Sequence, residues 1–345
     1  MKKKIIYSVI ALVLVISAIA TFKVFGPTVN APEKKYFYVK TGDTYEMVKT
    51  DLLEAKIIGG GFWFNQVAKK LSYNAKVKAG RYEIKDGMSI FSLVRMLRSG
   101  NQSPVKLVIN KLRTKEDLAK KIAANFECDS LSVISFLNNT DSIRNYNLDS
   151  NTVMTAVIPN TYSILWNTSP AKIFKKLYAD HEKFWTESRR EKAAALNMTP
   201  KQVYTMASIV EEETNKEEDK GKIASVYINR IETGMKLEAD PTVKFAMRDF
   251  GLKRIRHVHL AYPSPYNTYQ QTGLPPGPIC TPSSKTIDAV LNAPQTNYIF
   301  FVAKPDFNGY SNFASTYAEH LVFAKAYQNA LDSLIKAKAA RAANQ

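Results

Sequence analysis

Cysteine and histidine are scarce in this chain of 345 residues. It contains two cysteines, Cys128 and Cys280, and four histidines. Two cysteines are too few for a disulfide framework, so we expect either two buried thiols, which we favour, or one bridge. The histidines form no HExxH motif, and the HVH at 257–259 fits the alternation of a strand better than a metal site. We therefore predict no metal and no other cofactor.

Acidic residues are also outnumbered. The 31 Asp and Glu face 48 Lys and Arg, which gives a formal net charge of +17. Such an excess favours an anionic partner: nucleic acid, anionic lipid or a carboxylate-rich polymer. A hydrophobic content of 45% at this length excludes a disordered chain and leaves room for about two domains.

Charge is absent from one long segment near the start. Residues 5–22, IIYSVIALVLVISAIATF, carry no charged side chain and as a helix would span about 27 Å, roughly the hydrocarbon core of a membrane. Lys2, Lys3 and Lys4 precede this run, which predicts an N-terminus in the cytoplasm and the rest of the chain outside. The alternative is a cleaved signal peptide, because AIA at 18–20 resembles a cleavage site. An extracytoplasmic location argues against nucleic acid as the partner.

Three similar units follow a proline- and lysine-containing linker at 26–35. Each has a β-rich run, a turn, a helix N-cap residue (Thr44, Ser89 or Thr114) and apolar residues at helical spacing. The first two units predict a small α+β module over 36–103. The third opens a larger α+β domain over 104–345, mostly helical between 115 and 200, where AVIPNTYSILWNTSP interrupts the pattern.

A further helix is predicted over residues 200–214. Its start has Thr199 as N-cap, Pro200 at the first position and Gln202 as the capping-box partner. Its end carries three adjacent glutamates in the stretch ASIVEEET.

The three glutamates of this helix point in different directions. Glu213 shares a face with Met206 and Ile209 and so points toward apolar neighbours. Glu211 lies on another side, beside small residues that leave room for a ligand, and Glu212 is expected to be solvated. A plain charged helix end is the simplest explanation, although the helix dipole disfavours carboxylates there. The helical wheel does not decide whether Glu211 or Glu213 is a functional acid.

Two later segments have residues that packing does not readily explain. In KLEADPTVKFA, Asp240 follows a helix that Gly234 can end. The segment PSPYNTYQQTGLPPGPICTP is polar, aromatic and stiffened by proline, which suits a sugar ligand but is equally typical of a surface loop.

The order and intervals of several motifs carry more weight than any one of them. MASIVEEET, KIASVYINRIETGMKLEADPTV, YNTYQQTGLPPGPI and NFASTYAEH together resemble the endolytic murein transglycosylases, the MltG or YceG-like family of membrane-anchored cell-wall enzymes. The resemblance covers nearly the whole chain, including the anchor and a LysM-like module at 36–103. One departure is Asn160 in IPNTY, where the family usually has an acid, so a second catalytic carboxylate from this loop is in doubt.

The resemblance implies an activity and a set of site residues. The catalytic acid would be Glu211, the first of the run, with Glu213 supporting the substrate site. One acid suffices for a lytic transglycosylase, because the 6-hydroxyl of N-acetylmuramic acid can attack its own anomeric carbon and leave a 1,6-anhydro end. Our candidates for holding the saccharide are Asp240, Tyr266, Asn267, Thr268 and Tyr269.

The resemblance also implies partners and a location. The partners would be peptidoglycan glycan strands and peptidoglycan synthases, and the enzyme would be anchored in the bacterial cytoplasmic membrane with its catalytic domain outside. The alternatives are a two-carboxylate muramidase and a non-catalytic membrane-tethered scaffold that binds peptidoglycan. The products distinguish the three: anhydro ends, reducing ends or no cleavage.

Overall fold

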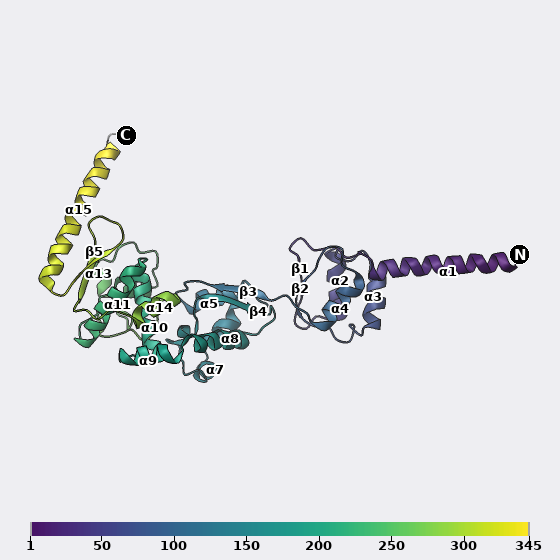
Figure 1. Ribbon diagram of the computed structural model, residues 1–345, viewed down its shortest axis with the longest axis horizontal. Coiled ribbons are helices and arrows are strands. Elements are labelled where there is room, and N and C mark those ends of the chain that lie inside the picture. Colours follow the sequence, from purple (N-terminus) through teal and green to yellow (C-terminus); the bar gives the residue numbers. More distant parts are fainter. Residues whose placement is uncertain (1, 344–345) are drawn as a thin grey trace. The chain divides into compact units, whose positions relative to one another are not determined.

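The computed structural model describes residues 2–343, and their side chains through residue 339. The chain divides into two compact units (Figure 1). Unit 1 comprises residues 2–107, 122–129 and 162–169, and unit 2 comprises 108–121, 130–161 and 170–343.

Unit 1 is built on a two-stranded antiparallel sheet and short helices. Thr44 and Ser89 cap their helices as predicted, accepting hydrogen bonds from the backbone N–H groups of Met47 and Ser92. β1 and β2 pair from Tyr36 opposite Glu83 to Val39 opposite Gly80. The sequence did not lead us to expect α3. The elements are α1 (Lys2–Phe25), β1 (Tyr36–Val39), α2 (Tyr45–Glu54), α3 (Gly61–Lys70), β2 (Gly80–Glu83) and α4 (Ile90–Ser99).

The segment at 26–35 packs on this module, in contrast to the predicted linker. Val29 is 1% exposed and belongs to the same core as Val39, Leu52 and Leu93. Its backbone forms isolated bridges to Ile58 and Met88. Its apolar side chain thus closes one edge of the module. The LysM-like identity of residues 36–103 stays a prediction.

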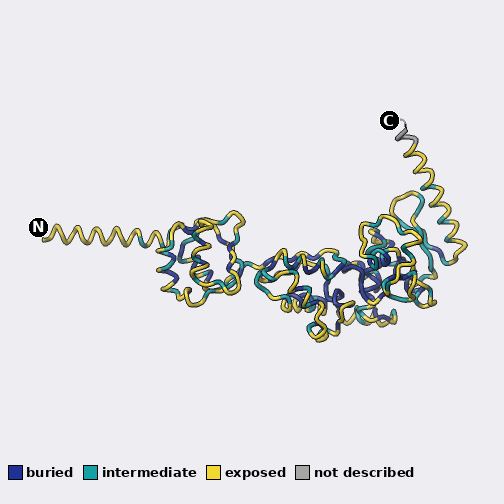
Figure 2. The backbone as a smooth tube through the Cα atoms, turned by 180° about the vertical axis from the view of Figure 1, so that it is seen from behind, coloured by how far each residue is buried: buried dark blue, intermediate teal, exposed yellow. Residues whose placement is uncertain are grey.

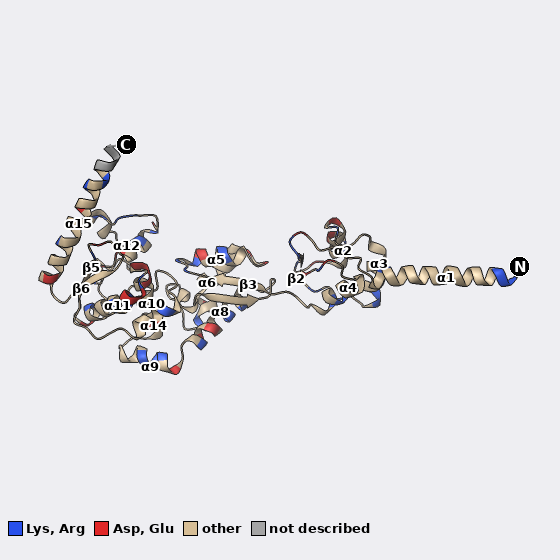
Figure 3. Cartoon of the chain, turned by 45° about the horizontal axis from the view of Figure 1, so that its top comes forward, with Lys and Arg blue, Asp and Glu red and all other residues tan. Residues whose placement is uncertain are grey.

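Helix α1 is long and apolar enough to cross a membrane. Its most apolar 18-residue window has a mean hydropathy of 2.6, and none of that window is buried (Figure 2). Figure 3 shows basic residues at the N-terminal end of this helix, where Lys2, Lys3 and Lys4 lie, and Lys23 lies in its last turn. A helix that is hydrophobic on all sides and is not covered by the rest of the protein is typical of a membrane span or a signal sequence.

The remaining elements lie wholly or partly in unit 2. β3 pairs with β4, so the predicted interruption of the helical region contains a strand. β5 and β6 form an antiparallel hairpin. The elements are β3 (Val105–Ile109), α5 (Lys115–Ala123), α6 (Ser130–Asn138), α7 (Thr140–Arg144), the 3-10 helix η1 (Val153–Ala156), β4 (Asn160–Ile164), α8 (Pro170–Phe184), α9 (Glu187–Ala195), α10 (Pro200–Glu213), α11 (Glu217–Glu232), α12 (Asp240–Met247), α13 (His257–Leu260), α14 (Ser284–Leu291), β5 (Phe300–Ala303), β6 (Ser311–Ala314) and α15 (Tyr317–Ala343).

Three local expectations can be compared with this structure. The third strand, turn and helix unit is confirmed, and Thr114 accepts a 3.0 Å hydrogen bond from the Asp117 N–H. The expected strand at 257–259 is wrong, because these residues form the short helix α13. Both cysteines are free thiols, but only Cys280 is buried, while Cys128 is half-buried.

Helix α10 is the centre of the unit 2 core. The predicted capping box is present, with Thr199 and Gln202 bonding each other's backbone N–H groups. Residues 203–210 are all buried, and α11 and α14 pack against them. The buried Ser208 hydroxyl accepts from the Ile279 N–H at 3.0 Å and donates to the Thr205 carbonyl, so its hydrogen-bonding capacity is used. This packing fixes the end of α10, where the three glutamates lie.

Candidate active site

The three adjacent carboxylates of α10 have three different environments. Glu211 is held by a buried polar cluster. Its Oε2 atom lies 3.3 Å from Lys220 Nζ and accepts a 3.2 Å hydrogen bond from the Ser283 hydroxyl and a further one from Thr286. The side chains of Glu211 and Lys220 are 16% and 4% exposed. Glu211 therefore ties α10 to α11 and α14.

Glu212 is not solvated, which corrects the prediction from the sequence. Its side chain is 15% exposed and pairs with Arg113 at 2.9 Å and Lys111 at 3.2 Å. Burial by itself would raise the pKa of Glu212, but the hydrogen bond from Arg113 and the charge of Lys111 outweigh it and lower this pKa. Glu212 thus joins α10 to the segment after β3 as a charged residue.

Glu213, the last residue of α10, lies in a cavity. Its carboxylate accepts a 2.9 Å hydrogen bond from the Tyr227 hydroxyl of α11. Burial raises the pKa of Glu213 to about 7, the Tyr227 hydrogen bond opposes this, and the charge of Asp240 adds to it. The helix dipole also raises this pKa, because the C-terminal end of a helix disfavours a negative charge. Glu213 can therefore carry a proton near neutral pH.

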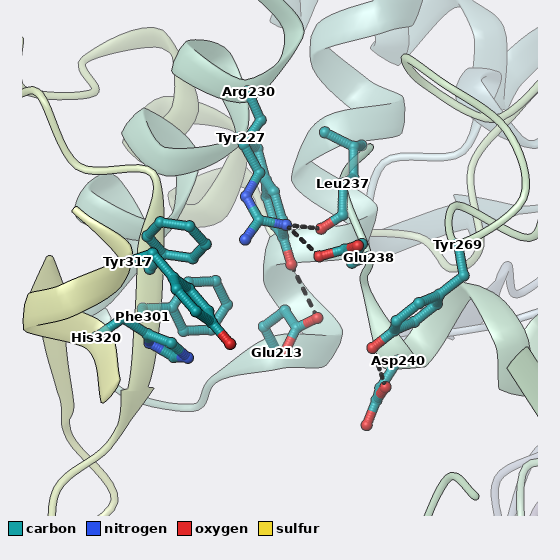
Figure 4. Close-up of a pocket in the computed structure, with 11 residues that line it drawn as sticks. Glu213, Tyr227, Arg230, Leu237, Glu238, Asp240, Tyr269, Phe301, Tyr317 and His320 are labelled. Carbon is teal, nitrogen blue, oxygen red and sulfur yellow. Dashed lines mark hydrogen bonds and ion pairs between the residues drawn. The ribbon is translucent and has the colours of Figure 1, made fainter. Parts of the chain in front are cut away.

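The cavity has a volume of about 360 Å³ and is open to solvent. In Figure 4, Glu213 lies between Tyr269 and Asp240 on one side and Tyr317 and His320 on the other. The Tyr269 hydroxyl donates a 2.7 Å hydrogen bond to Asp240, the first residue of α12. Glu213 and Asp240 thus line the same cavity with different partners.

Aromatic side chains from the C-terminal elements form the other wall. His320 of α15 stacks on Phe300 of β5 with ring centroids 5.1 Å apart. Burial, together with the charge of Arg230, lowers the pKa of His320, so its imidazole is neutral near pH 7. Phe301 packs edge-on against Tyr227 at 6.0 Å, which connects this wall to α11. Flat apolar faces beside polar groups suit a sugar ring.

Arg230 joins the two sides of the cavity. Its Nε donates to the Ile299 carbonyl at 2.7 Å, just before β5, and its Nη1 donates to the Leu237 carbonyl at 2.9 Å, just before α12. The same Nη1 lies 3.3 Å from Glu238. Because guanidinium donors have a fixed geometry, this one side chain sets the spacing between the hairpin and the start of α12.

The predicted sugar-binding residues are only partly brought together. Asp240 and Tyr269 line the cavity with Glu213. Asn267 is 0% and Thr268 is 1% exposed, so neither can contact a saccharide here. Tyr266 packs on Phe245 at 4.8 Å and does not line this cavity.

Asn267 and Thr268 instead build the loop. The Asn267 amide donates to the carbonyls of Leu260 and Tyr262 at 3.0 and 2.8 Å. The Thr268 hydroxyl accepts from the Ala239 N–H at 3.0 Å. These bonds fasten the loop to the start of α12, which positions Tyr269 next to Asp240.

The proline-rich turn after this loop is fixed by a close backbone approach. A Cβ atom on Gly277 would lie 2.1 Å from the carbonyl oxygen of Asn151, a distance that only glycine avoids. Any larger residue at 277 would push the turn away from the segment before η1.

Sequence reasoning missed several residues of the cavity. Tyr227 and Arg230 lie in the quoted motif KIASVYINRIETGMKLEADPTV, and Tyr317 and His320 lie in NFASTYAEH, yet no role had been given to them. The sequence feature that could have identified these four residues was their position within those motifs. Among residues 2–343, no group of three or more His, Cys, Asp or Glu could hold a metal ion, and the absence of a metal stays a prediction.

Comparison with known proteins agrees with this fold and these motifs. The chain is 28% identical over 274 residues to the endolytic murein transglycosylase of Bacillus subtilis (strain 168), covering 73% of this chain and 75% of that protein. It is also 28% identical to the endolytic murein transglycosylase of Streptococcus pneumoniae (strain R6), over 80% of this chain but only 55% of that protein.

A solved structure is similar as well. A crystal structure of a YceG-like protein from Listeria monocytogenes superposes with a TM-score of 0.55 at 26% identity, covering 84% of this chain and 98% of the other. The model of the YceG-like family matches residues 37–326. The chain therefore belongs to the YceG-like family.

Proposed function

We propose that the protein is a lytic transglycosylase that cuts peptidoglycan glycan strands internally, with Glu213 as its general acid. The observation that carries this proposal is the half-buried Glu213 in an open cavity, with a pKa raised to about 7. The relatives named endolytic murein transglycosylases support the substrate and the reaction class. The proposal reverses the roles expected from the sequence, because Glu211 is engaged by Lys220 and two hydroxyls and does not line the cavity.

The chemistry needs one group that can both give and take a proton. Protonated Glu213 would donate to the oxygen between N-acetylmuramic acid and the next sugar as the glycosidic bond breaks. The resulting carboxylate would accept the proton of the ring's own 6-hydroxyl as that oxygen bonds to the anomeric carbon. Tyr227, which donates to the carboxylate, would stabilise the charged form between these steps. The product is a 1,6-anhydro end, and no water is consumed.

A second candidate is hydrolysis by a two-carboxylate muramidase. The observation in its favour is that Asp240 lines the same cavity as Glu213, so a second carboxylate is available despite Asn160. In hydrolysis such a group activates water or attacks the anomeric carbon. In the proposed lytic reaction, Asp240 would only stabilise positive charge that develops on the sugar.

The products should distinguish the two reactions. After incubation with uncrosslinked glycan, we expect mass spectrometry to find ends one water lighter than hydrolysis products, in fragments of many lengths. Asp240→Asn should slow this reaction without changing the product. Reducing ends from the wild type, abolished by Asp240→Asn, would instead establish the muramidase. Release of disaccharides alone would contradict internal cutting.

The pH dependence of the activity should follow the titration of Glu213. Because Glu213 must be protonated and its pKa is raised to about 7, activity should be retained below that pH and fall about tenfold per pH unit above it. Tyr227→Phe removes a hydrogen bond that favours the carboxylate, so this fall should move to higher pH. Tyr310→Phe removes a tyrosine hydroxyl that donates to Glu218 and does not line the cavity, so this control should leave the profile in place. A fall centred near pH 4.5 would contradict the assignment.

We also propose that α1 anchors the protein in the cytoplasmic membrane, with the catalytic unit outside. The intact protein should stay with the membrane fraction after a high-salt wash, because salt screens charges and leaves hydrophobic insertion unaffected. Deletion of residues 2–25 should release it. A mature chain that begins near Thr21 and remains soluble would indicate a cleaved signal peptide. Cooperation with peptidoglycan synthases stays a prediction.

A further inference from the structure

A second groove of unit 2 shares a wall with the catalytic cavity. It has a volume of about 440 Å³ and is lined by Arg254, Arg256 and His257, together with Asp240 and Tyr269. The last two residues also line the cavity that holds Glu213. A ligand in this groove would therefore lie next to a substrate bound at the acid. We call it the cationic groove.

The segment that forms the outer side of the groove is strongly basic. Residues 250–262 contain Lys253, Arg254 and Arg256 but no Asp or Glu, and these three side chains are exposed. Among the described residues, no ion pair involves Arg254 or Arg256. Two guanidinium groups thus point to solvent without a counter-ion from the described part of the chain.

Asp240 supplies the one carboxylate among the described residues that line the groove. It already accepts a hydrogen bond from the Tyr269 hydroxyl, and it faces the catalytic cavity as well. Two guanidinium groups against one carboxylate leave the groove with a net positive charge. Guanidinium groups bind planar oxyanions with two parallel hydrogen bonds, and carboxylates fit this geometry.

We propose that the cationic groove binds a carboxylate of the peptide attached to the sugar at the cleavage site. This inference rests on the proposed function and adds a determinant of substrate choice. In a peptide-bearing strand the lactyl carboxyl of N-acetylmuramic acid is part of the amide bond to the peptide, so the anions nearest to a cleaved bond are the free carboxylates of that peptide. A groove that shares Asp240 and Tyr269 with the acid cavity lies within reach of such a peptide. A phosphate at the end of a lipid-linked strand is the other oxyanion source, but an internal cleavage site is distant from it.

The test compares strands that differ only in the carboxylates of their peptides. Full-length protein in detergent is given glycan strands with intact peptides, or the same strands after the peptide carboxylates have been converted to amides, and kcat/KM is measured by counting new ends. We expect the wild type to prefer the strands with free peptide carboxylates by roughly 10- to 100-fold, as one or two charged hydrogen bonds would give. In Arg254→Gln/Arg256→Gln this ratio should fall toward one. Arg254→Lys/Arg256→Lys should keep part of it.

A matched variant controls for the loss of two charges. Arg144→Gln/Lys172→Gln removes two exposed cations from α7 and α8 and should keep the wild-type ratio. The inference is overturned if the wild-type ratio is near one, or if Arg254→Gln/Arg256→Gln keeps the preference. A preference that depends on a lipid pyrophosphate at the strand end, and not on peptides, would assign the groove to phosphate. If neither the wild type nor any of the variants cleaves either substrate, the proposed function itself fails.

Discussion

Glu213→Gln is expected to lower kcat by roughly 10²- to 10⁴-fold, the range over which a positioned general acid and base accelerates a reaction. The amide keeps the shape of the side chain and can still pair with the Tyr227 hydroxyl, but it cannot donate and regain a proton. The measurement is the rate of new ends on uncrosslinked glycan strands, with substrate binding followed separately. Binding should change little, so the loss should lie in kcat.

The folded state of this variant can be checked by its stability. Burial raises the pKa of Glu213 to about 7, so the folded wild type binds this proton more tightly than the unfolded chain does. Its stability therefore falls as pH rises from about 4.5 toward 7. The amide introduced by Glu213→Gln cannot ionise, so this variant should be at least as stable as the wild type at pH 8. Lost activity would then not result from unfolding.

Glu211→Gln is the matched comparison, because it makes the same chemical change two residues away. It leaves Lys220 without its partner on α10, so it should lower stability, while the folded fraction keeps most of its turnover. The opposite pattern, an inactive Glu211→Gln and an active Glu213→Gln, would restore the role expected from the sequence and contradict our assignment.

The local fold could be predicted from the sequence where one segment determines its own structure. The N-caps Thr44 and Ser89, the capping box of Thr199 and Gln202, and the extent of α10 all follow from neighbours within a few residues. The HVH at 257–259 was assigned wrongly because three residues are too few to separate a period of two from one of 3.6.

The roles of the three glutamates could not be predicted in this way. A helical wheel gives the direction of each side chain but not what it meets. Glu212 meets Arg113, which is 99 residues earlier in the chain, and Glu211 meets Thr286, which is 75 residues later. The choice between Glu211 and Glu213 depends on these distant partners.

Polarity was misleading in the loop before the proline-rich turn. Asn267 and Thr268 have the composition of a binding loop, but they are enclosed and satisfy backbone groups of neighbouring segments. The same residue types serve both purposes, and only burial separates them. Tyr269 differs because its hydroxyl lies at the edge of the cavity, on Asp240.

The buried pair of Lys220 and Glu211 joins α10 to α11 by charge. Lys220 Nζ lies 3.3 Å from Glu211, 2.8 Å from Glu217 and 2.8 Å from the Thr286 hydroxyl, in a side chain that is 4% exposed. Lys220 also lies on the same helix as Tyr227, about two turns away. The pair therefore holds α10 and α11 in the arrangement in which Tyr227 reaches Glu213.

Lys220→Met is expected to lower the free energy of unfolding by about 3–5 kcal/mol, because it leaves the largely buried Glu211 carboxylate without a cation while filling most of the same volume. Urea unfolding at pH 7 with an unchanged m-value would measure this loss. The folded variant should also turn over more slowly, because the contact between Tyr227 and Glu213 loosens.

Lys220→Met/Glu211→Gln removes both charges, so its loss of stability should be smaller than the sum of the two single losses. Lys176→Met, which breaks an exposed pair with Asp180 on α8, is the control and should cost less than about 1 kcal/mol. A loss of that small size at Lys220, or strict additivity in the double variant, would mean that the two helices are held together by apolar packing alone.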